Sequence, residues 1–340
     1  MNKKRILIIG PAWVGDMVMA QTLFKMLKQI MPDAIIDVLA PDWTRALLNR
    51  MPEVNNSISM PIGHGEFNFK KRFALGLELR QKKYDEAYVL PNSFKSALIP
   101  FIAGIKKRTG WRGEMRYILL NDMRILNKEK LPLMIERFMA LALKPNETLK
   151  KPYFIPELVI DETSRANALI KHELKNDKPI FALCPGAEFG PSKRWPAAYF
   201  AEVANKKLDE GYQVWMFGSK NDLPITDEIL KATNNRVINL AGKTSLDEAI
   251  DLLSLAEIVI TNDSGLMHIA AALNKPLVAM YGSTSTKFTP PLGNKIEVLN
   301  LNLECSPCFK RECPLGHWKC MKDLKPQMAL DAIKKLEEKE

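Results

Sequence analysis

The stretch EIVITNDSGLMHIAAALNKPLVAMYGS, residues 257–283, decides the fold. Its pattern predicts a strand over 257–265, a helix over 266–273 and a second strand over 276–283. Elements in this order form two parallel strands joined by a crossover helix. The abrupt change at Asp-Ser-Gly exposes backbone N–H groups at the helix start, which suits a diphosphate.

The same alternation of strands and helices continues outward through both halves of the 340-residue chain. A length of about 100–200 residues per domain favours two domains. The proline-containing segment 144–162 has no steady period and predicts the boundary between them. The other strands that we expect lie at 5–10, 34–40, 57–61, 86–91, 179–186, 212–219 and 236–242. The sequence therefore predicts two Rossmann-like α/β halves.

Small and polar residues follow the strands of the second half, and open parallel sheets bind ligands at the carboxyl ends of their strands. Glycines at two of these ends allow close approach of a ligand. In the motif 261–276, Ser264 can donate a hydrogen bond to a ligand oxygen and Gly265 allows close approach of the ligand. Asp263 can hold a loop by accepting backbone hydrogen bonds. The histidine is either a contact to the nucleotide or a satisfied helix residue. These candidates are Gly218, Gly242, Asp263, Ser264, Gly265 and His268.

Lys193 lies in the loop 184–196, which follows the first strand of the second half. It is placed either to reach a phosphate at the same rim or to lie on the surface beside Arg194. Pro196 predicts the start of the next helix, because proline is favoured in a first helical turn.

The first loop of the chain, GPAWVGDM at 10–17, has the spacing of a phosphate-binding loop but lacks its lysine and hydroxyl residue. It also lacks the dinucleotide fingerprint, because Ala12 replaces a glycine, and this disfavours an NAD-dependent oxidoreductase. Asp16 instead presents a carboxylate at a helix start. It is either a general base for an acceptor hydroxyl or a helix N-cap.

The net charge of +10 is unevenly distributed. Residues 1–150 hold 25 Lys and Arg against 14 Asp and Glu, whereas residues 151–340 hold 24 against 25. The basic half is either a solvated surface or a contact for a phosphorylated lipid, a membrane surface or nucleic acid. Nucleic acid is disfavoured, because no basic stretch is interleaved with aromatics in the manner of RNA-binding proteins.

Cys305, Cys308, Cys313 and Cys320 lie close together in the sequence, with His317 among them. A CxxC with two more cysteines is typical of zinc sites, but the spacing lacks a second CxxC. Zinc binding and reduced structural cysteines both remain open. The chain has no run of about 18 apolar residues, and the apolar start leads into a loop and not a cleavage site. We therefore expect a cytoplasmic protein.

Five segments together resemble the ADP-heptose:lipopolysaccharide heptosyltransferases. They are ILIIGPAWVGDMVMAQ, RTGWRGEMRYILLND, PGAEFGPSKRWP, NDSGLMHIAAALNKPLVAMYGSTS and CSPCFKRECPLGHWKC. The resemblance implies a GT-B fold, an α/β architecture of two Rossmann-like domains whose parallel sheets face a central cleft. It implies an acceptor domain over 1–155, a donor domain over 175–322, and a helix over 323–340 that packs back on the N-terminal domain.

The resemblance also implies inverting transfer of L-glycero-D-manno-heptose from ADP-heptose to a heptose on the lipid A core, with no metal or other cofactor required. Asp16 matches the proposed base of the family, Lys193 a donor-phosphate contact, and Asp263, Ser264, Gly265 and His268 the donor loop. A phosphorylated lipid acceptor agrees with the basic first half, so we expect peripheral contact with the anionic inner-membrane surface. The rivals are an NDP-sugar 2-epimerase, a transferase of another sugar or core step, and a non-catalytic nucleotide-binding protein.

Overall fold

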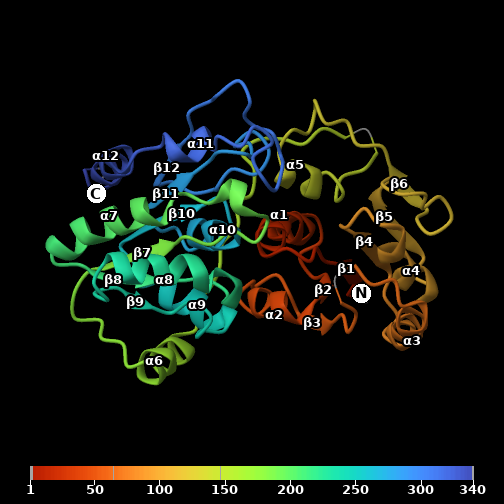
Figure 1. Ribbon diagram of the computed structural model, residues 1–340. Helices are drawn as coiled ribbons and strands as arrows, with labels where there is room; N and C mark the ends of the chain where they lie inside the picture. Colours follow the sequence, from red (N-terminus) through yellow and green to blue (C-terminus); the bar gives the residue numbers. More distant parts are fainter. Residues whose placement is uncertain (1–2, 64, 146, 339–340) are drawn as a thin grey trace. The chain divides into compact units, whose positions relative to one another are not determined.

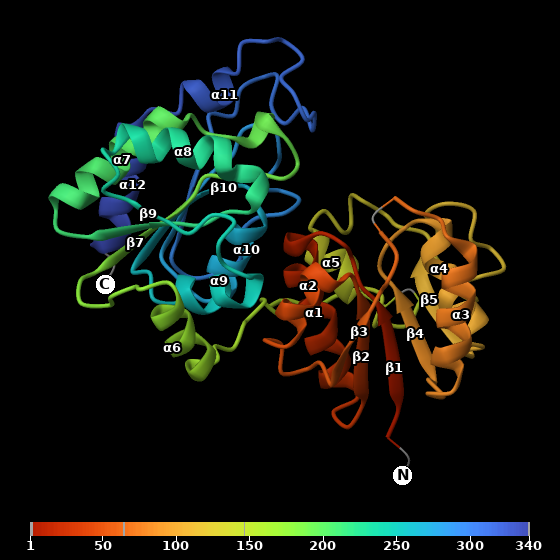
Figure 2. The same cartoon turned by 60° about the horizontal axis from the view of Figure 1, so that its bottom comes forward.

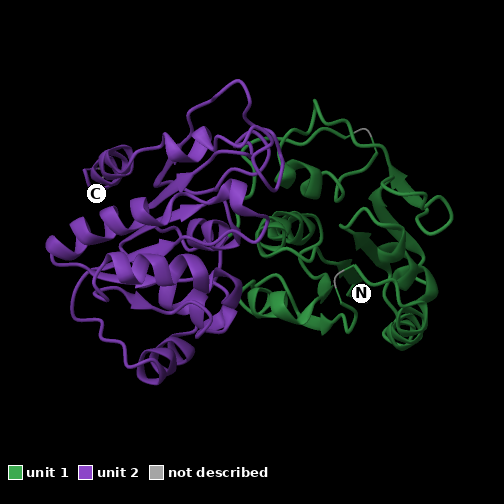
Figure 3. Ribbon diagram, in the orientation of Figure 1, with its two compact units in different colours: residues 1–156 green, residues 157–340 purple. Residues whose placement is uncertain are grey.

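The computed structural model describes residues 3–63, 65–145 and 147–338. The chain divides into two compact units, one up to Pro156 and one from Glu157 onward (Figure 3). This division falls inside the segment 144–162, which lacks a helical or strand period. The second unit includes the residues just before 175 and the tail after 322, which the expected boundaries kept apart from the donor domain.

Unit 1 contains a six-stranded sheet in the order β3-β2-β1-β4-β5-β6. All neighbouring strands in it are parallel. The strands expected at 5–10, 34–40, 57–61 and 86–91 are confirmed as β1 to β4, whereas β5 and β6 were not predicted. Their bounds are β1 Arg5–Ile9, β2 Ile35–Ala40, β3 Asn56–Ser59, β4 Glu86–Val89, β5 Lys107–Trp111 and β6 Asp122–Arg124.

Helices cover both faces of this sheet (Figures 1 and 2). Helices α3 (Phe69–Arg80) and α4 (Phe94–Ile102) pack together and bury one face, from which Leu7 and Val89 project. On the other face lie α1 (Val14–Ile30), α2 (Asp42–Leu48) and α5 (Met134–Met139). The order of strands reverses direction at β1, so α1 begins at the switch point where such sheets bind ligands.

Unit 2 repeats the design with a parallel six-stranded sheet in the order β12-β11-β10-β7-β8-β9. The fold class predicted from the sequence, two Rossmann-like α/β domains of the GT-B type, is therefore confirmed. The edge strand β12 was missed, because Glu297 interrupts its short apolar pattern. The strands are β7 Ile180–Cys184, β8 Gln213–Met216, β9 Ile238–Asn239, β10 Ile258–Asn262, β11 Leu277–Met280 and β12 Ile296–Leu299.

The helices of unit 2 alternate with these strands. Their bounds are α6 Glu162–Lys171, α7 Ala197–Asp209, α8 Leu223–Ala232, α9 Leu246–Leu253, α10 Gly265–Ala272, α11 Lys319–Lys322 and α12 Pro326–Glu337. Two short 3₁₀ turns, η1 Pro191–Lys193 and η2 Lys220–Asp222, precede α7 and α8. No helix in the described ranges is both long enough and apolar enough to cross a membrane.

The final helix, α12, is part of the core of unit 2. Its residues Ala329, Ile333 and Leu336 are buried, and it packs on α7, β11 and β12. Trp195 Nε1 also donates to the carbonyl of Leu324, 2.7 Å away, just before this helix. This placement differs from the expected packing on the N-terminal domain, because the apolar face of α12 is covered within its own unit.

Candidate functional site

Asp16 lies in the first turn of α1 and not at its N-cap. Trp13 occupies the N-cap and makes no side-chain capping bond, and Asp16 is the third helical residue. The hypothesis that Asp16 is the N-cap residue is therefore wrong, because Trp13 occupies that position. The side chain is partly buried at the N-terminal end of the helix, where the helix dipole favours negative charge.

The turn that carries Asp16 has a fixed shape. The Gly10 N–H donates to the carbonyl of Leu39, 2.9 Å away, and a Cβ at Gly10 would lie 2.6 Å from Met17 Cε. The indole N–H of Trp43 donates to the carbonyl of Ala12 at 2.8 Å. Met17 therefore leaves no room for a side chain at residue 10. The hydrogen bond from Trp43, a residue of α2, holds the loop before Asp16 in place.

In unit 2, β10 ends at Asn262, before the expected strand end at 265, and α10 begins at Gly265, one residue before the expected helix start at 266. Ser264 is the N-cap residue of α10, but its side chain makes no capping bond. Its hydroxyl oxygen lies 3.5 Å from that of Thr261. Because the first backbone N–H groups of a helix have no intrahelical acceptor, this end offers donors to an anionic ligand.

Lys193 and Asp263 come together beside this helix start. Lys193 Nζ lies 2.7 Å from Asp263 Oδ2, and only 4% of the Asp263 side chain is exposed. Thr284 Oγ1 donates to the same carboxylate oxygen. The expectation that Lys193 is a surface lysine beside Arg194 is thus wrong, because its charge is paired in the loop that precedes α10. Asp263 holds this loop through side-chain donors.

His268 is buried in the same group. Burial lowers its pKa to about 4, against the Asp263 charge, which raises the pKa, and together with the Lys193 charge, which lowers it. The imidazole is therefore neutral near pH 7. In this state it can donate one hydrogen bond and accept one, but it cannot supply a proton as an imidazolium.

Gly218 and Gly242 lie beside the η2 turn, at the ends of β8 and β9. The Gly242 N–H donates to the Gly218 carbonyl at 2.9 Å, and Gly242 has a φ of +68°, which favours glycine. A Cβ would lie 3.1 Å from Asp222 Cβ at Gly218 and 3.0 Å from Lys220 Cγ at Gly242. A side chain at either glycine would crowd η2, and the Lys193–Asp263 pair lies in the loops that follow β7 and β10.

Sequence reasoning missed Asp222, a buried carboxylate on this rim. Its Oδ2 accepts from the N–H and the hydroxyl of Ser219, and its Oδ1 has no hydrogen-bond partner among the described residues, with Arg194 Nη2 3.7 Å away. A Cβ at Gly186 would lie 2.4 Å from its carboxyl carbon. The capping-box spacing of Ser219 and Asp222 was the signal available in the sequence.

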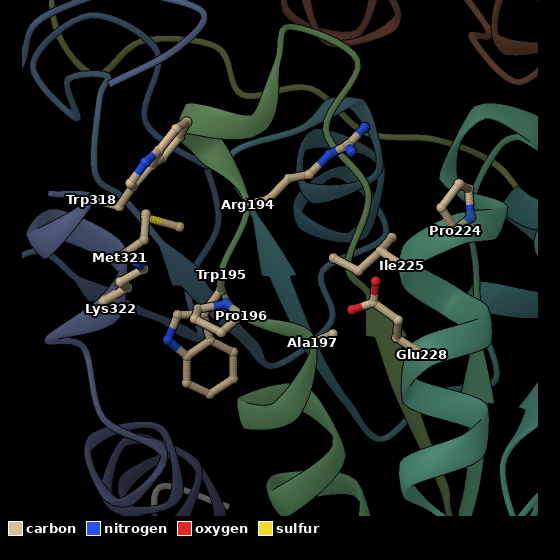
Figure 4. A pocket seen from close by; sticks show the side chains of 10 residues that line it. All are labelled: Arg194, Trp195, Pro196, Ala197, Pro224, Ile225, Glu228, Trp318, Met321 and Lys322. Atoms are coloured by element: carbon tan, nitrogen blue, oxygen red, sulfur yellow. The ribbon is translucent and has the colours of Figure 1, made fainter. Parts of the chain in front are cut away.

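A cavity of about 340 Å³ borders the loop of Lys193 (Figure 4). Trp318 and Met321 line one side of it, and Ile225 and Glu228 of α8 line the other, with Arg194 between them. Lys193, Asp263 and His268 do not line this cavity. We place the candidate site at the Lys193–Asp263 pair, because the paired charges and the open helix start meet there.

The four clustered cysteines are free thiols and lie near one another. Burial raises the pKa of Cys320, and charge on Cys313, Cys305 and Cys308 raises it further. Cys305 Sγ lies 4.0 Å from His317 Nε2. Within the described residues, no group of three or more His, Cys, Asp or Glu side chains is arranged to hold a metal ion.

Comparisons with known proteins find relatives of this chain over nearly its whole length. The model of glycosyltransferase family 9 (heptosyltransferase) matches residues 72–319. The chain is 50% identical to lipopolysaccharide heptosyltransferase 2 of Escherichia coli K12 over 98% of both chains. It is 47% identical to lipooligosaccharide heptosyltransferase 2 of Haemophilus influenzae, over 97% of this chain and 99% of that one.

Solved structures show the same likeness. The structure of E. coli ADP-heptose LPS heptosyltransferase II matches with a TM-score of 0.88 and 49% identity, covering 98% of both chains. E. coli heptosyltransferase WaaC with ADP matches with a TM-score of 0.73 over 98% of this chain and 99% of that one. At 19% identity, the latter match shows the fold alone.

Proposed function

The chain belongs to glycosyltransferase family 9, the heptosyltransferases, and from this premise we propose that it catalyses the second heptose transfer to the lipopolysaccharide inner core. The donor is ADP-heptose and the acceptor is the first heptose of the lipid A core. The observation that carries the proposal is the Lys193–Asp263 pair beside the uncapped start of α10, in a chain 50% identical to a heptosyltransferase 2.

The start of α10 is the proposed seat of the donor diphosphate. Its first backbone N–H groups and the Ser264 hydroxyl supply donors, and Gly265 leaves room for close approach. Asp263 holds the Lys193 ammonium at this position before the donor binds. When the diphosphate binds, Lys193 stabilises the charge that develops on the departing ADP. Gly218 and Gly242 are the proposed approach to the nucleoside.

His268 serves this site as a neutral group. Because burial lowers its pKa to about 4, it contributes a hydrogen bond to the donor and does not protonate the leaving phosphate. The leaving group departs as the ADP anion, so the reaction does not require a general acid to protonate the departing phosphate oxygen.

Asp16 is the proposed general base of a direct displacement. Its carboxylate takes the proton of the acceptor hydroxyl while the oxygen bonds to the heptose anomeric carbon. The bond from that carbon to the phosphate oxygen breaks at the same centre, which inverts it. The place of Asp16 in the first turn of α1 keeps a negative charge available for this step.

The acceptor lipid suggests where the enzyme works. Residues 1–150 carry the excess of positive charge, so we place the enzyme at the cytoplasmic face of the inner membrane, in peripheral contact with anionic lipid. Lipid phosphate, and not nucleic acid, is the anionic partner of this half.

Incubation of the protein with ADP-heptose and defined truncated lipopolysaccharide cores tests the function, with mass spectrometry of the products. We expect one heptose to be added to the core that already carries one heptose. Addition only to a core without heptose, or only to longer cores, would assign another step. An isomerised sugar nucleotide formed without acceptor would identify a 2-epimerase instead.

A further inference from the structure

An exposed apolar ridge runs along α3 of unit 1. It consists of Phe67, Phe69, Phe73 and Leu77, which are 51%, 49%, 45% and 40% exposed. The last three recur every four residues, so they share one face of the helix. The ring centroids of Phe67 and Phe69 lie 6.4 Å apart, and those of Phe69 and Phe73 lie 6.0 Å apart. The ridge is therefore continuous, and water covers aromatic surface that a folded core would bury.

A buried arginine holds the ridge in place. Arg72 is 5% exposed and donates to the carbonyls of Glu66 and Phe67, which fixes the chain just before α3. It also donates to the carbonyl of Lys95 on α4 at 3.3 Å. Arg72 therefore fixes the N-terminal end of the ridge against α4.

A second apolar group lies on the loop after β5. Met115, Tyr117 and Ile118 are 81%, 61% and 79% exposed. Between them, Arg116 is completely buried and donates to the carbonyl of Pro91 at 2.7 Å and to that of Trp111. A single buried polar anchor therefore stands among three outward apolar side chains.

The same loop is clamped to the start of α4 at a second point. Glu114 Oε2 accepts from the Phe94 N–H at 2.7 Å, which caps that helix. A Cβ at Gly113 would lie 2.3 Å from the carbonyl oxygen of Asn92. Arg72 and Arg116 thus fasten two apolar groups to one short stretch, residues 91–96.

Both groups begin at the edge of the sheet that carries Asp16. Helix α3 is the first helix after β3 and the loop 112–121 follows β5, and the carboxyl ends of these parallel strands share the edge from which α1 starts. Positive charge accompanies them, since residues 66–83 hold six Lys and Arg against two Glu. Exposed aromatics beside basic residues are the composition of surfaces that insert into the headgroup region of anionic bilayers.

We propose that the α3 ridge and the 115–118 loop dock this protein on the anionic bilayer that holds its acceptor. This inference rests on the proposed function for the identity of the bilayer, but binding to lipid can be measured without it. The basic residues supply long-range attraction, and the apolar side chains enter the interface, so the edge with Asp16 faces the lipid headgroups.

Sedimentation with lipid vesicles tests the proposal on the full chain. We expect binding to vesicles of phosphatidylcholine mixed with phosphatidylglycerol, weaker binding to phosphatidylcholine alone, and loss of binding at high salt. Ile118→Ser, and the pair Phe69→Ser with Phe73→Ser, should weaken binding about ten-fold or more, because each removes apolar area from the interface. Ile170→Ser on α6 is the matched control, since Ile170 is 78% exposed in unit 2 and should change nothing.

Transfer to a deacylated, soluble acceptor separates this proposal from the proposed function. We expect the ridge and loop variants to keep wild-type rates on that acceptor and wild-type melting temperatures. If wild-type protein lacks transfer but its vesicle binding still depends on the ridge, only the function is wrong. Vesicle binding unchanged in the variants overturns the docking proposal. So does a concentration-dependent dimer that the variants abolish, because a second copy would then cover the face.

Discussion

The ammonium nitrogen of Lys193 and the Oδ2 atom of Asp263 lie 2.7 Å apart, in an ion pair that joins the loop after β7 to the loop after β10. Neither residue is near the other in sequence. The pair therefore holds the two loops of the donor site together and also fixes the position of its positive charge. Substitutions of Lys193 or Asp263 should affect both.

Lys193→Met should weaken ADP binding and also lower stability. It removes the cation from the proposed diphosphate seat and leaves the buried Asp263 carboxylate without its ammonium partner, although the Thr284 hydroxyl still donates to it. A loss of about 1–3 kcal/mol of unfolding free energy follows from an uncompensated buried charge. Calorimetric titration with ADP and urea unfolding measure the two effects. Asp263→Asn together with Lys193→Met should recover stability but not ADP binding, and recovery of both would contradict the assignment.

Asp16→Asn should abolish heptose transfer and leave ADP binding nearly intact. A positioned general base contributes about 10²–10⁴ in rate, and the substitution keeps the shape of the side chain. Single-turnover rates and ADP titration of the same preparation provide the comparison. Equal losses of transfer and ADP binding would mean that Asp16 supports the start of α1 and is not the base.

His268 should make the stability of the protein fall as the pH falls below about 6.5. Its pKa is lowered to about 4 in the folded protein, so only the unfolded chain takes up this proton between those values. The neutral form therefore contributes stability that is fully present above pH 6.5 and is lost toward pH 4. The slope is about 1.4 kcal/mol per pH unit. Urea unfolding of wild type and His268→Gln between pH 7 and 5 should show this slope in the difference, and parallel curves would contradict it.

Gly186→Ala should destabilise unit 2. The added Cβ would lie 2.4 Å from the carboxyl carbon of Asp222, which is buried and bonded to Ser219. Overpacking of this kind costs about 1–3 kcal/mol. Gly293→Ala is the control, because the nearest atoms to its Cβ would be the end of the Ile296 side chain at 3.2 Å and the Ala271 carbonyl oxygen at 3.5 Å. Equal melting temperatures for the two variants would show that η2 moves freely.

Cys313 should react with iodoacetamide faster than Cys184 or Cys320. Burial raises its pKa, but several backbone N–H groups, led by that of Trp318, stabilise the thiolate and together lower its pKa overall. Burial raises the pKa of both Cys184 and Cys320. Peptide mapping by mass spectrometry after short exposure gives the order of labelling. Faster labelling of Cys320 would contradict the order.

The sequence predicted the architecture well where apolar runs were strong. The strands around β1 and β10 were found because uninterrupted Ile, Leu and Val runs mark strands buried on both faces. The edge strand β12 and helix α6 were missed, because both are partly exposed and carry mixed polarity. Helix α12 packs on α7, β11 and β12, and an amphipathic pattern alone does not show which partner a helix packs on.

The candidate site was predicted in part for a similar reason. A motif within one loop, such as that around Ser264, is visible in the sequence. The partners of Asp263 were not, because Lys193 is 70 residues away and Thr284 is 21 residues away. Asp222 was missed because its contact with Gly186 is made only after β7 and β8 pair.

The hydrogen bond from Trp195 to Leu324 gives the end of the chain an influence on the donor loop. Trp195 stands two residues after Lys193, and its main-chain N–H is bonded to Asn262, next to Asp263. Trimming the chain before α11 would therefore open the hydrophobic interior of unit 2 and release the indole from its acceptor. The shortened protein should bind nucleotide more weakly, even though none of the deleted residues belongs to the donor site.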